Sequence, residues 1–158
     1  MEINDITTEK SSRKRQVILF ICTHNSARSQ MAEGYLRARH GDTFDVHSAG
    51  TEVRGVNPVA IAVMSEIGID ISGHRSKLID EFIGRDTDVV VTVCDNAHQS
   101  CPFFPGTKTI IHAGFHDPSA CAGTSRECLD VFRTVRDEII EWIDHSFVPE
   151  YGNNVHLR

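Results

Sequence analysis

The stretch of sequence that decides the fold is Val17-Ile18-Leu19-Phe20-Ile21-Cys22-Thr23-His24-Asn25-Ser26-Ala27-Arg28-Ser29. Residues 17–21 form a continuous apolar run, which is typical of a strand buried on both faces of a parallel sheet. The residues from Gln30 onward predict a helix, so the segment between them is a strand-to-helix turn. We therefore expect an α/β fold whose first strand ends at Cys22.

The turn that begins at Cys22 has the residue types of an oxyanion-binding loop. Loop amides and a helix N-terminus supply inward-pointing donors, and the planar guanidinium of Arg28 can clamp two oxygens. The same positive field would favour the thiolate form of Cys22, which is the nucleophile. Because a cysteine and an arginine at this spacing are common by chance, a buried Cys22 beside a surface Arg28 is the alternative. The predicted oxyanion-binding residues are Thr23, His24, Asn25, Ser26, Ala27, Arg28 and Ser29.

Length and composition indicate one globular domain. The chain has 158 residues with 40% hydrophobic content, which suffices for one full core. A net charge of −6 argues against general nucleic-acid binding, and no apolar stretch approaches the roughly 20 residues of a membrane-spanning helix. Residues 1–16 are polar and lack a secretory signal, so the five cysteines indicate a reducing cytoplasm. We expect a cytoplasmic monomer with neither nucleic-acid nor membrane partners.

Short apolar runs alternate with helical stretches along the chain. Strands are predicted at residues 17–21, 44–50, 89–93 and 109–112. Helices are predicted from residue 30 to Gly41, from Asn57-Pro58 to Gly68, near 79–83, and from the Thr124–Glu127 capping box through Ile143. This order predicts a single three-layer α/β domain over residues 16–148, with a four-stranded, mostly parallel sheet flanked by helices. Residues 1–15 are expected to be a polar, disordered arm, and 149–158 a polar, frayed tail.

Ligands of such sheets bind beyond the carboxyl ends of the strands, where three segments of this chain should meet. They are the loop that starts at Cys22, the segment after Val93 and the loop after His112. Topology therefore predicts one site built from three distant segments.

The second segment carries Cys94 and Cys101. In a helix their positions would differ by about 10.5 Å along the axis, whereas a disulfide needs Cα atoms within about 7 Å. The pair can close only if the segment unwinds or loops out, and Asp95, Asn96 and Pro102 are poor residues for a helix interior. Two unrelated thiols are the alternative.

The third segment carries Asp117, which the following Pro118 holds in an extended conformation. A carboxylic acid at this place could donate a proton to a leaving oxygen beside Cys22. An ordinary Asp-Pro turn is the alternative.

Cys121 and Cys128 are predicted to be structural, because the first precedes the capping box and the second lies inside the helix, where a small buried thiol is the usual explanation. A zinc site is disfavoured, since the sequence has neither CxxC nor HxxxH spacing.

Together these segments resemble the low-molecular-weight protein tyrosine phosphatase family. The likeness rests on Cys22-x5-Arg28-Ser29 and on Asp117-Pro118 far downstream. The pair Cys94 and Cys101 resembles the thioredoxin-coupled arsenate reductase branch of that family. Further matches are Ser29-Gln30-Met31-Ala32-Glu33-Gly34, Ser48-Ala49-Gly50, Gly55-Val56-Asn57-Pro58 and Ile69-Asp70-Ile71-Ser72, and the likeness spans about residues 16 to 146.

The resemblance implies that the protein reduces arsenate to arsenite through a three-cysteine relay, in arsenic detoxification. Cys22 would attack arsenate, Arg28 would stabilise its charge and Asp117 would protonate the departing hydroxyl. Cys94 would then attack the sulfur of Cys22 and release arsenite, and Cys101 would attack Cys94. Thioredoxin would reduce the resulting disulfide, and the relay requires neither a metal nor another cofactor.

At one cation-binding site this chain differs from the family that it resembles. Some family members bind potassium with residues matching Asn25, Glu33 and Ser48 and with a carboxylate. Lys77 stands at the carboxylate position, so we expect its ammonium to occupy the cation site and predict no potassium requirement.

Two other functions fit part of the pattern. A low-molecular-weight phosphatase would use only Cys22, Arg28 and Asp117, and a non-enzymatic thiol sensor would use the pair Cys94 and Cys101. Phosphate and arsenate are near-isosteric, so the oxyanion loop does not separate reductase from phosphatase. The downstream pair favours the reductase, because hydrolysis needs neither thiol.

Overall fold

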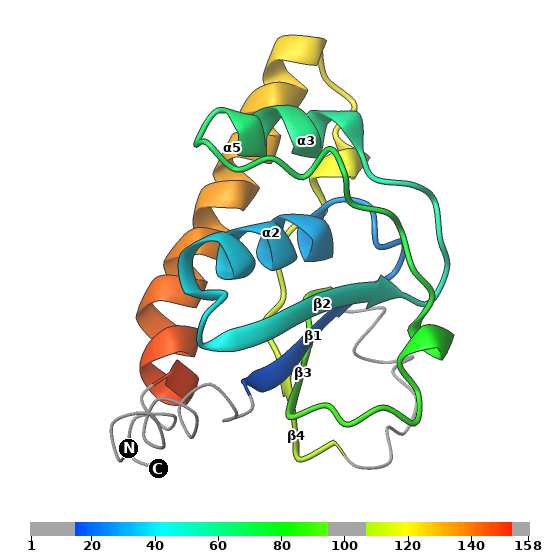
Figure 1. The fold of residues 1–158 in the computed structure, drawn as a ribbon. Helices are drawn as coiled ribbons and strands as arrows, with labels where there is room; N and C mark the ends of the chain where they lie inside the picture. The colour runs from blue at the N-terminus through cyan, green and yellow to red at the C-terminus, as the bar shows by residue number, and fades with distance from the viewer. Residues whose placement is uncertain (1–14, 95–106, 153–158) are drawn as a thin grey trace, which may run out of the picture.

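The computed structural model describes residues 15–94 and 107–152, which contain one four-stranded sheet (Figure 1). Its strand order is β2-β1-β3-β4, and every neighbouring pair is parallel. The strands are β1 (Gln16–Cys22), β2 (Phe44–Gly50), β3 (Val89–Thr92) and β4 (Thr109–His112). Because all four run the same way, their carboxyl ends form one edge. In the register, Cys22 is paired with Gly50 at this edge.

Helices cover the sheet and pack against one another (Figure 1). They are α2 (Arg28–His40), α3 (Pro58–Ser65), α5 (Ser125–Trp142), the π-helical segment η3 (Ile143–Gly152), and the short 3₁₀ helices η1 (Ile79–Glu81) and η2 (Pro118–Ala120). On one face, Phe20 of β1 and Phe44 of β2 pack on Phe147 of η3, with ring centroids 6.4 and 5.5 Å apart. On the other face, His47 of β2 contacts Phe82 beside η1. The α/β sheet with flanking helices is thus confirmed.

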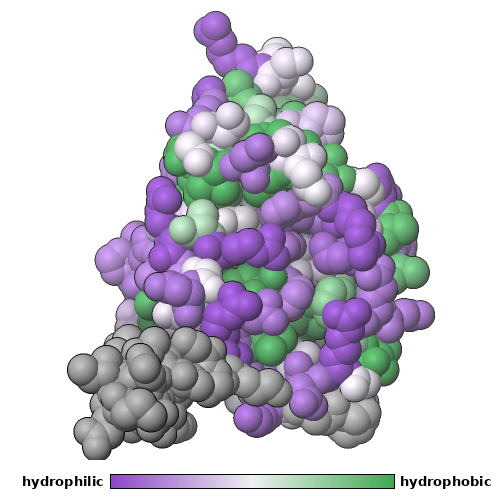
Figure 2. All heavy atoms as spheres, in the orientation of Figure 1, coloured by the Kyte–Doolittle hydropathy of each residue, from purple (hydrophilic) through white to green (hydrophobic). Residues whose placement is uncertain are grey.

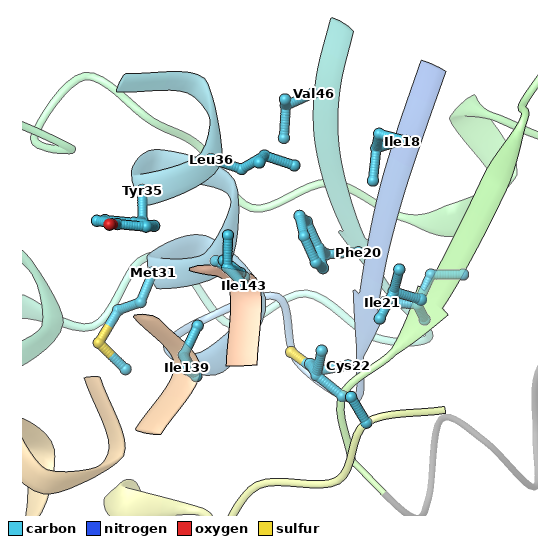
Figure 3. Close-up of a cluster of buried hydrophobic side chains, with 14 of the residues drawn as sticks. Ile18, Phe20, Ile21, Cys22, Met31, Tyr35, Leu36, Val46, Ile139 and Ile143 are labelled. Carbon is cyan, nitrogen blue, oxygen red and sulfur yellow. The ribbon is translucent and has the colours of Figure 1, made fainter. Parts of the chain in front are cut away.

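The alternation of side chains along β1 fixes which face meets the helices. Phe20 and Cys22 project from the same side of the strand, toward the helices that carry Leu36 and Ile139 (Figure 3). All four side chains are at most 2% exposed. Burying such apolar side chains away from water is the main contribution to the stability of the fold. The same packing holds Cys22 in place at the end of its strand.

Local signals in the sequence account for where the helices begin. Asn57 caps α3 by accepting a hydrogen bond from the amide of Val59, and Thr124 and Glu127 form the predicted capping box of α5. Helix α2 is different, because Ala27 stands at its N-cap and has no side chain able to accept a hydrogen bond. The first amides of α2 are therefore not capped by that side chain, as an anion site at this end requires.

Some element ends differ from the sequence-based expectations by one to three residues, since α3 ends at Ser65 rather than Gly68 and β3 at Thr92 rather than Val93. Two further expectations also differ from the structure. The helical conformation continues to Gly152, so the first four residues of the expected 149–158 tail are helical. Cys121 and Cys128 are not buried thiols, because they form a half-buried disulfide with Cα atoms 5.6 Å apart. The chain turns between η2 and α5, which brings the two cysteines together although Cys128 is helical. The expected arm (1–15) and most of the tail lie outside the described residues.

Hydrophilic residues cover much of the face shown in Figure 2, and hydrophobic residues lie between them in small groups. Over residues 15–94 and 107–152, no helix has the length and apolar content that crossing a membrane requires.

Candidate active site

A pocket of about 600 Å³ opens at the carboxyl edge of the sheet. It is lined by residues from all three segments that the topology places there: Thr23, His24, Arg28, Cys94, Gly114, Phe115, His116 and Asp117. Cys22 and the remaining predicted oxyanion-binding residues do not line this pocket: Cys22, Asn25, Ala27 and Ser29 are buried, and Ser26 is half-buried. Cys101 lies outside the described residues, as does the predicted looping-out of the segment that carries it.

The thiol of Cys22 is 2% exposed and lies 2.9 Å from the hydroxyl oxygen of Ser29. That oxygen accepts a hydrogen bond of 2.8 Å from the side-chain amide of Asn25. Because Ser29 is already an acceptor toward Asn25, its own proton is available to Cys22. A hydroxyl that donates to sulfur stabilises the thiolate, so this contact supports Cys22 as a nucleophile.

Asn25 holds the loop in an unusual conformation. Its φ of 49° lies in the left-handed region, where asparagine is tolerated better than most residues. Its side-chain oxygen accepts from the backbone amide of Lys77 at 2.8 Å and from Gln30 at 3.0 Å, and its nitrogen also donates to Ser48. Its carbonyl accepts from the hydroxyl of Ser76 at 2.7 Å. Contacts from three other segments thus stabilise a backbone conformation that would otherwise be costly.

Glu33 and Lys77 form the cluster where the resemblance implied a cation. The buried carboxylate of Glu33 accepts hydrogen bonds from Ser48 and Arg37. The Lys77 ammonium lies 3.7 Å from the same carboxylate, and its side chain is only 12% exposed. Burial lowers the pKa of Lys77, and the charge of Glu33 opposes that shift. These residues do not fit a bound potassium ion, because the protein's own ammonium lies against the carboxylate.

Arg28 and Asp117 lie close together in the lining of the pocket. One Arg28 nitrogen donates to the carbonyl of Phe115 at 3.1 Å, and another lies 3.6 Å from the Asp117 carboxylate. Burial alone would raise the pKa of Asp117, but hydrogen bonds from Ser119 and the charges of Arg28 and His24 outweigh it and lower the pKa. Asp117 is therefore ionised near neutral pH in this state. An anion in the pocket would share the charge of Arg28 and favour protonation of Asp117.

Cys94 directly follows the third predicted strand and lines the same pocket, although it is only 4% exposed. Its sulfur is 3.3 Å from the hydroxyl of Thr23, the residue next to Cys22. Cys22 and Cys94 are both thiols rather than disulfide partners. Two thiols from different strands are thus brought to one loop.

Two contributors were missed by sequence reasoning. Gln30 is fully buried and donates to Asn25 and to the carbonyl of Arg75, so it ties the loop to a distant segment. Phe115 lines the pocket and packs edge-on against Trp142, with ring centroids 6.2 Å apart. A polar residue on the buried face of a predicted helix was the available signal for Gln30. No comparable signal marked Phe115.

Within the described ranges, no three His, Cys, Asp or Glu side chains are arranged to hold a metal ion. Three histidines near the site, His24, His74 and His116, lie on separate segments. Among the described residues, the site offers thiols, the guanidinium of Arg28, the carboxylate of Asp117 and the imidazoles of His24 and His116.

A family model for low molecular weight phosphotyrosine protein phosphatase matches residues 17–145. The chain therefore belongs to the low-molecular-weight phosphotyrosine protein phosphatase family, to which a thiol and an arginine at one strand-to-helix turn already pointed.

Among the relatives that match most of this chain are several arsenate reductases. That of Halalkalibacterium halodurans is 51% identical over 125 residues, which are 79% of this chain and 90% of that protein. The solved structure of an arsenate reductase in its phosphate-binding state has a TM-score of 0.71 and 36% identity, covering 82% of this chain and 94% of the other. The thioredoxin-dependent arsenate reductase of Corynebacterium glutamicum has a TM-score of 0.60 and 26% identity, covering 88% and 65%.

Proposed function

We propose that this protein reduces arsenate to arsenite with Cys22 as nucleophile, Cys94 and Cys101 as the resolving pair and thioredoxin as reductant. The observation that carries the proposal is the thiol of Cys94 in the pocket of the Cys22 loop, because a hydrolase needs no second thiol there. The arsenate reductases among its relatives support the substrate, and the thioredoxin-dependent relative supports the reductant.

The first step is nucleophilic substitution at arsenic. The Cys22 thiolate attacks arsenate, an As–O bond breaks and the oxygen leaves as water after protonation by Asp117. Arg28 and the amides at the start of α2 stabilise the negative charge of the arsenic oxygens. Binding of the anion near Arg28 weakens the attraction that keeps Asp117 ionised, so the acid gains its proton when substrate is present.

The second step transfers two electrons to arsenic. The Cys94 sulfur attacks the sulfur of Cys22, the S–As bond breaks toward arsenic and arsenite leaves as a trivalent species. A Cys22–Cys94 disulfide remains. Cys101 then attacks Cys94, which frees Cys22 and produces a Cys94–Cys101 disulfide, and the thioredoxin dithiol reduces this bond by exchange. We expect the cycle to run in the cytoplasm of the cell, on a monomer.

A phosphatase is the second candidate. Cys22, Arg28 and Asp117 suffice for hydrolysis of a phosphate ester, and Phe115 gives the pocket one aromatic wall that an aryl phosphate could contact. This activity would leave Cys94 without a chemical role.

The deciding experiment follows NADPH consumption with arsenate, thioredoxin and thioredoxin reductase, for the wild type and single Cys→Ser variants. We expect the variants of Cys22, Cys94 and Cys101 to lose turnover, and those of Cys121 and Cys128 to remain active, because neither thiol takes part in the relay. Hydrolysis of p-nitrophenyl phosphate is measured in parallel. Full arsenate turnover by Cys94→Ser and Cys101→Ser would refute the relay, and strong hydrolysis by the same variants would favour the phosphatase.

A further inference from the structure

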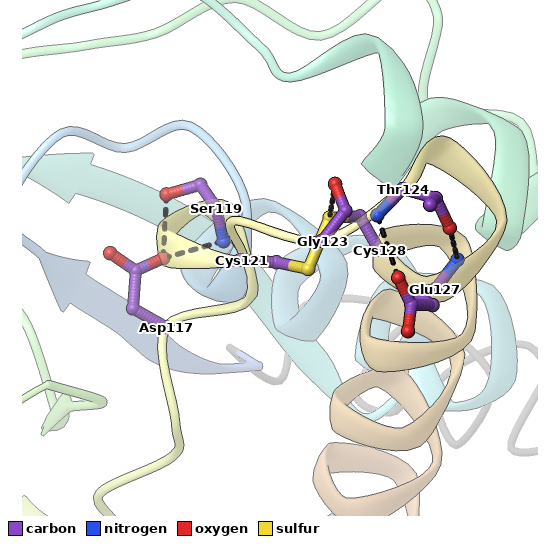
Figure 4. Close-up of a disulfide and its surroundings, with 7 residues drawn as sticks. All are labelled: Asp117, Ser119, Cys121, Gly123, Thr124, Glu127 and Cys128. Carbon is purple, nitrogen blue, oxygen red and sulfur yellow. Dashed lines mark hydrogen bonds between the residues drawn. A yellow bond between two sulfur atoms is a disulfide. The ribbon is translucent and has the colours of Figure 1, made fainter.

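The Cys121–Cys128 disulfide lies one short turn away from Asp117 (Figure 4). Cys121 directly follows η2, and Asp117 directly precedes it. Cys128 lies in the first turn of α5, where its amide donates to the carbonyl of Thr124. The disulfide therefore joins the segment that carries the acid to a helix of the core.

The two cysteines of the disulfide are more exposed to solvent than Cys22 and Cys94. Both of its cysteines are half-buried, and all six residues between them are exposed. Cys22 and Cys94 are 2% and 4% exposed. Residues 121–128 are therefore more open to a thiolate from solvent than the pocket region around Cys22 and Cys94. The helix N-terminus stabilises Cys128 as the leaving thiolate.

The contacts that hold Asp117 in place are few and mostly exposed. Its carboxylate accepts from the amide and hydroxyl of Ser119 at 3.0 and 2.7 Å, and its carbonyl accepts from the amide of Ala120 at 3.3 Å. The amide of Cys121 donates to the carbonyl of Pro118, the one buried residue of η2. Exposed hydrogen bonds of this kind contribute little, so the covalent bond to α5 is the strongest restraint on this turn.

Helix α5 is itself firmly held. Phe132, Val135 and Ile139 are at most 3% exposed and belong to the hydrophobic core. The disulfide thus connects a weakly held turn to a strongly held helix. Breaking it should release the turn while leaving the helix in place.

We propose that Cys121–Cys128 is a redox modification site whose state sets the position of Asp117, a positioning role that rests on the acid function proposed above. A dithiol reduces the site: its thiolate attacks the sulfur of Cys121, the S–S bond breaks, and Cys128 leaves as a thiolate and takes up a proton. The second thiol of the reagent then displaces Cys121, so that two thiols form and the dithiol becomes a disulfide. A disulfide reagent restores the bond by the reverse exchange.

The turn should be less mobile when the disulfide is intact (the closed state) than when it is broken (the open state). With the bond intact, Asp117 stays beside Arg28, where it can take up a proton once an anion binds. With the bond broken, the turn is held by the packing of Pro118, by exposed hydrogen bonds and by the 3.6 Å ion pair of Asp117 with Arg28, without a covalent link to α5. In the reducing cytoplasm expected for this chain the open state prevails, and oxidation closes it.

The test uses hydrogen exchange and the titration of Asp117, neither of which requires turnover. Exchange of the Ser119 and Cys121 amides is compared with the disulfide intact, after reduction by dithiothreitol, and in the Cys121→Ser/Cys128→Ser variant. We expect exchange about tenfold faster in both open forms, with the amides of Val135 and Ile139 unchanged. Dithiothreitol should not change the exchange rates of the variant, and this control shows that reduction elsewhere in the protein does not affect these amides.

The titration of Asp117 separates positioning from a general loss of stability. In the closed form Ser119 and Arg28 hold the pKa of Asp117 below its ordinary value, and in the open form it should move toward that value. Equal exchange rates and equal titrations in closed and open forms would overturn the proposal. A wild type that does not reduce arsenate would refute the proposed function alone, because both readouts remain measurable.

Discussion

Replacement of Gly50 by alanine should displace the oxyanion loop, although Gly50 lies on the neighbouring strand. A Cβ at this position would lie 2.6 Å from the carbonyl of Glu52, 2.7 Å from the amide of Asn25 and 2.8 Å from the carbonyl of Thr23. All three are backbone atoms, and two belong to the loop that follows Cys22. Each must retreat by about 0.6–0.8 Å to reach an ordinary contact distance of 3.4 Å.

The loop has little freedom to make this movement. The amide of Gly50 donates to the carbonyl of Lys77 at 2.8 Å, and the amide of Glu52 donates to the carbonyl of Thr23 at 2.8 Å. Overpacking typically costs about 1–3 kcal/mol, and three backbone clashes place Gly50→Ala at about 3 kcal/mol. For a chain of this size we expect a fall in Tm of about 6–12 °C. Because the clash displaces the oxyanion loop, whose backbone amides would donate hydrogen bonds to the anion, the Kd for phosphate should rise at least about tenfold.

The assays are urea unfolding for stability and calorimetry for phosphate binding. Gly73→Ala is the matched control, because nothing lies within 4 Å of its Cβ position, and its free energy of unfolding and phosphate affinity should stay close to those of the wild type. If Gly50→Ala keeps the stability and phosphate affinity of Gly73→Ala, the close approach of β2 to the oxyanion loop does not have the role argued here.

Three further predictions concern single contacts of the site. Ser29→Ala removes the hydroxyl that lies 2.9 Å from the Cys22 sulfur. Alkylation of Cys22 by iodoacetamide at pH 7 should therefore slow by about tenfold. An unchanged rate would show that the hydroxyl does not stabilise the thiolate. The pKa of Asp117, now lowered by Ser119 and Arg28, should rise when phosphate saturates the pocket, as followed by carboxyl NMR; a constant pKa would contradict sharing of the Arg28 charge. Turnover and Tm should be equal in potassium and sodium, since Lys77 is 3.7 Å from the Glu33 carboxylate; a clear rise in potassium would refute this prediction.

Local patterns in the sequence predicted most of the strands and helices of the fold. The apolar run ending at Cys22, the cap at Asn57 and the capping box at Thr124 each depend on neighbouring residues, and each is as predicted. The spacing of apolar residues and the caps of helices depend on residues only a few positions apart, so both can be recognised in a single sequence. The start of α2 at Arg28 is two residues earlier than predicted, because a helix boundary depends on what its first turn contacts.

The cysteines show where such reasoning fails. The axial separation predicted for Cys94 and Cys101 holds for a continuous helix, whereas the pair Cys121 and Cys128 spans the start of one. Cys121 precedes the helix, the chain turns at Gly123, and the Cα atoms approach to 5.6 Å. Spacing along the chain therefore predicts pairing only when the path of the chain is known.

By itself, the sequence determined that a thiol, an arginine and a helix start share one turn, because those residues are contiguous. It also predicted that the segments after Val93 and His112 reach the same edge, since parallel strands place their carboxyl ends together. Only the tertiary structure decided how the turn is held. Asn25 keeps its left-handed backbone through partners on α2, β2 and the segment before η1, and these partners are brought together by packing of the whole core. Contacts between segments so far apart in the sequence form only when the whole core packs, and no local sequence pattern marks them.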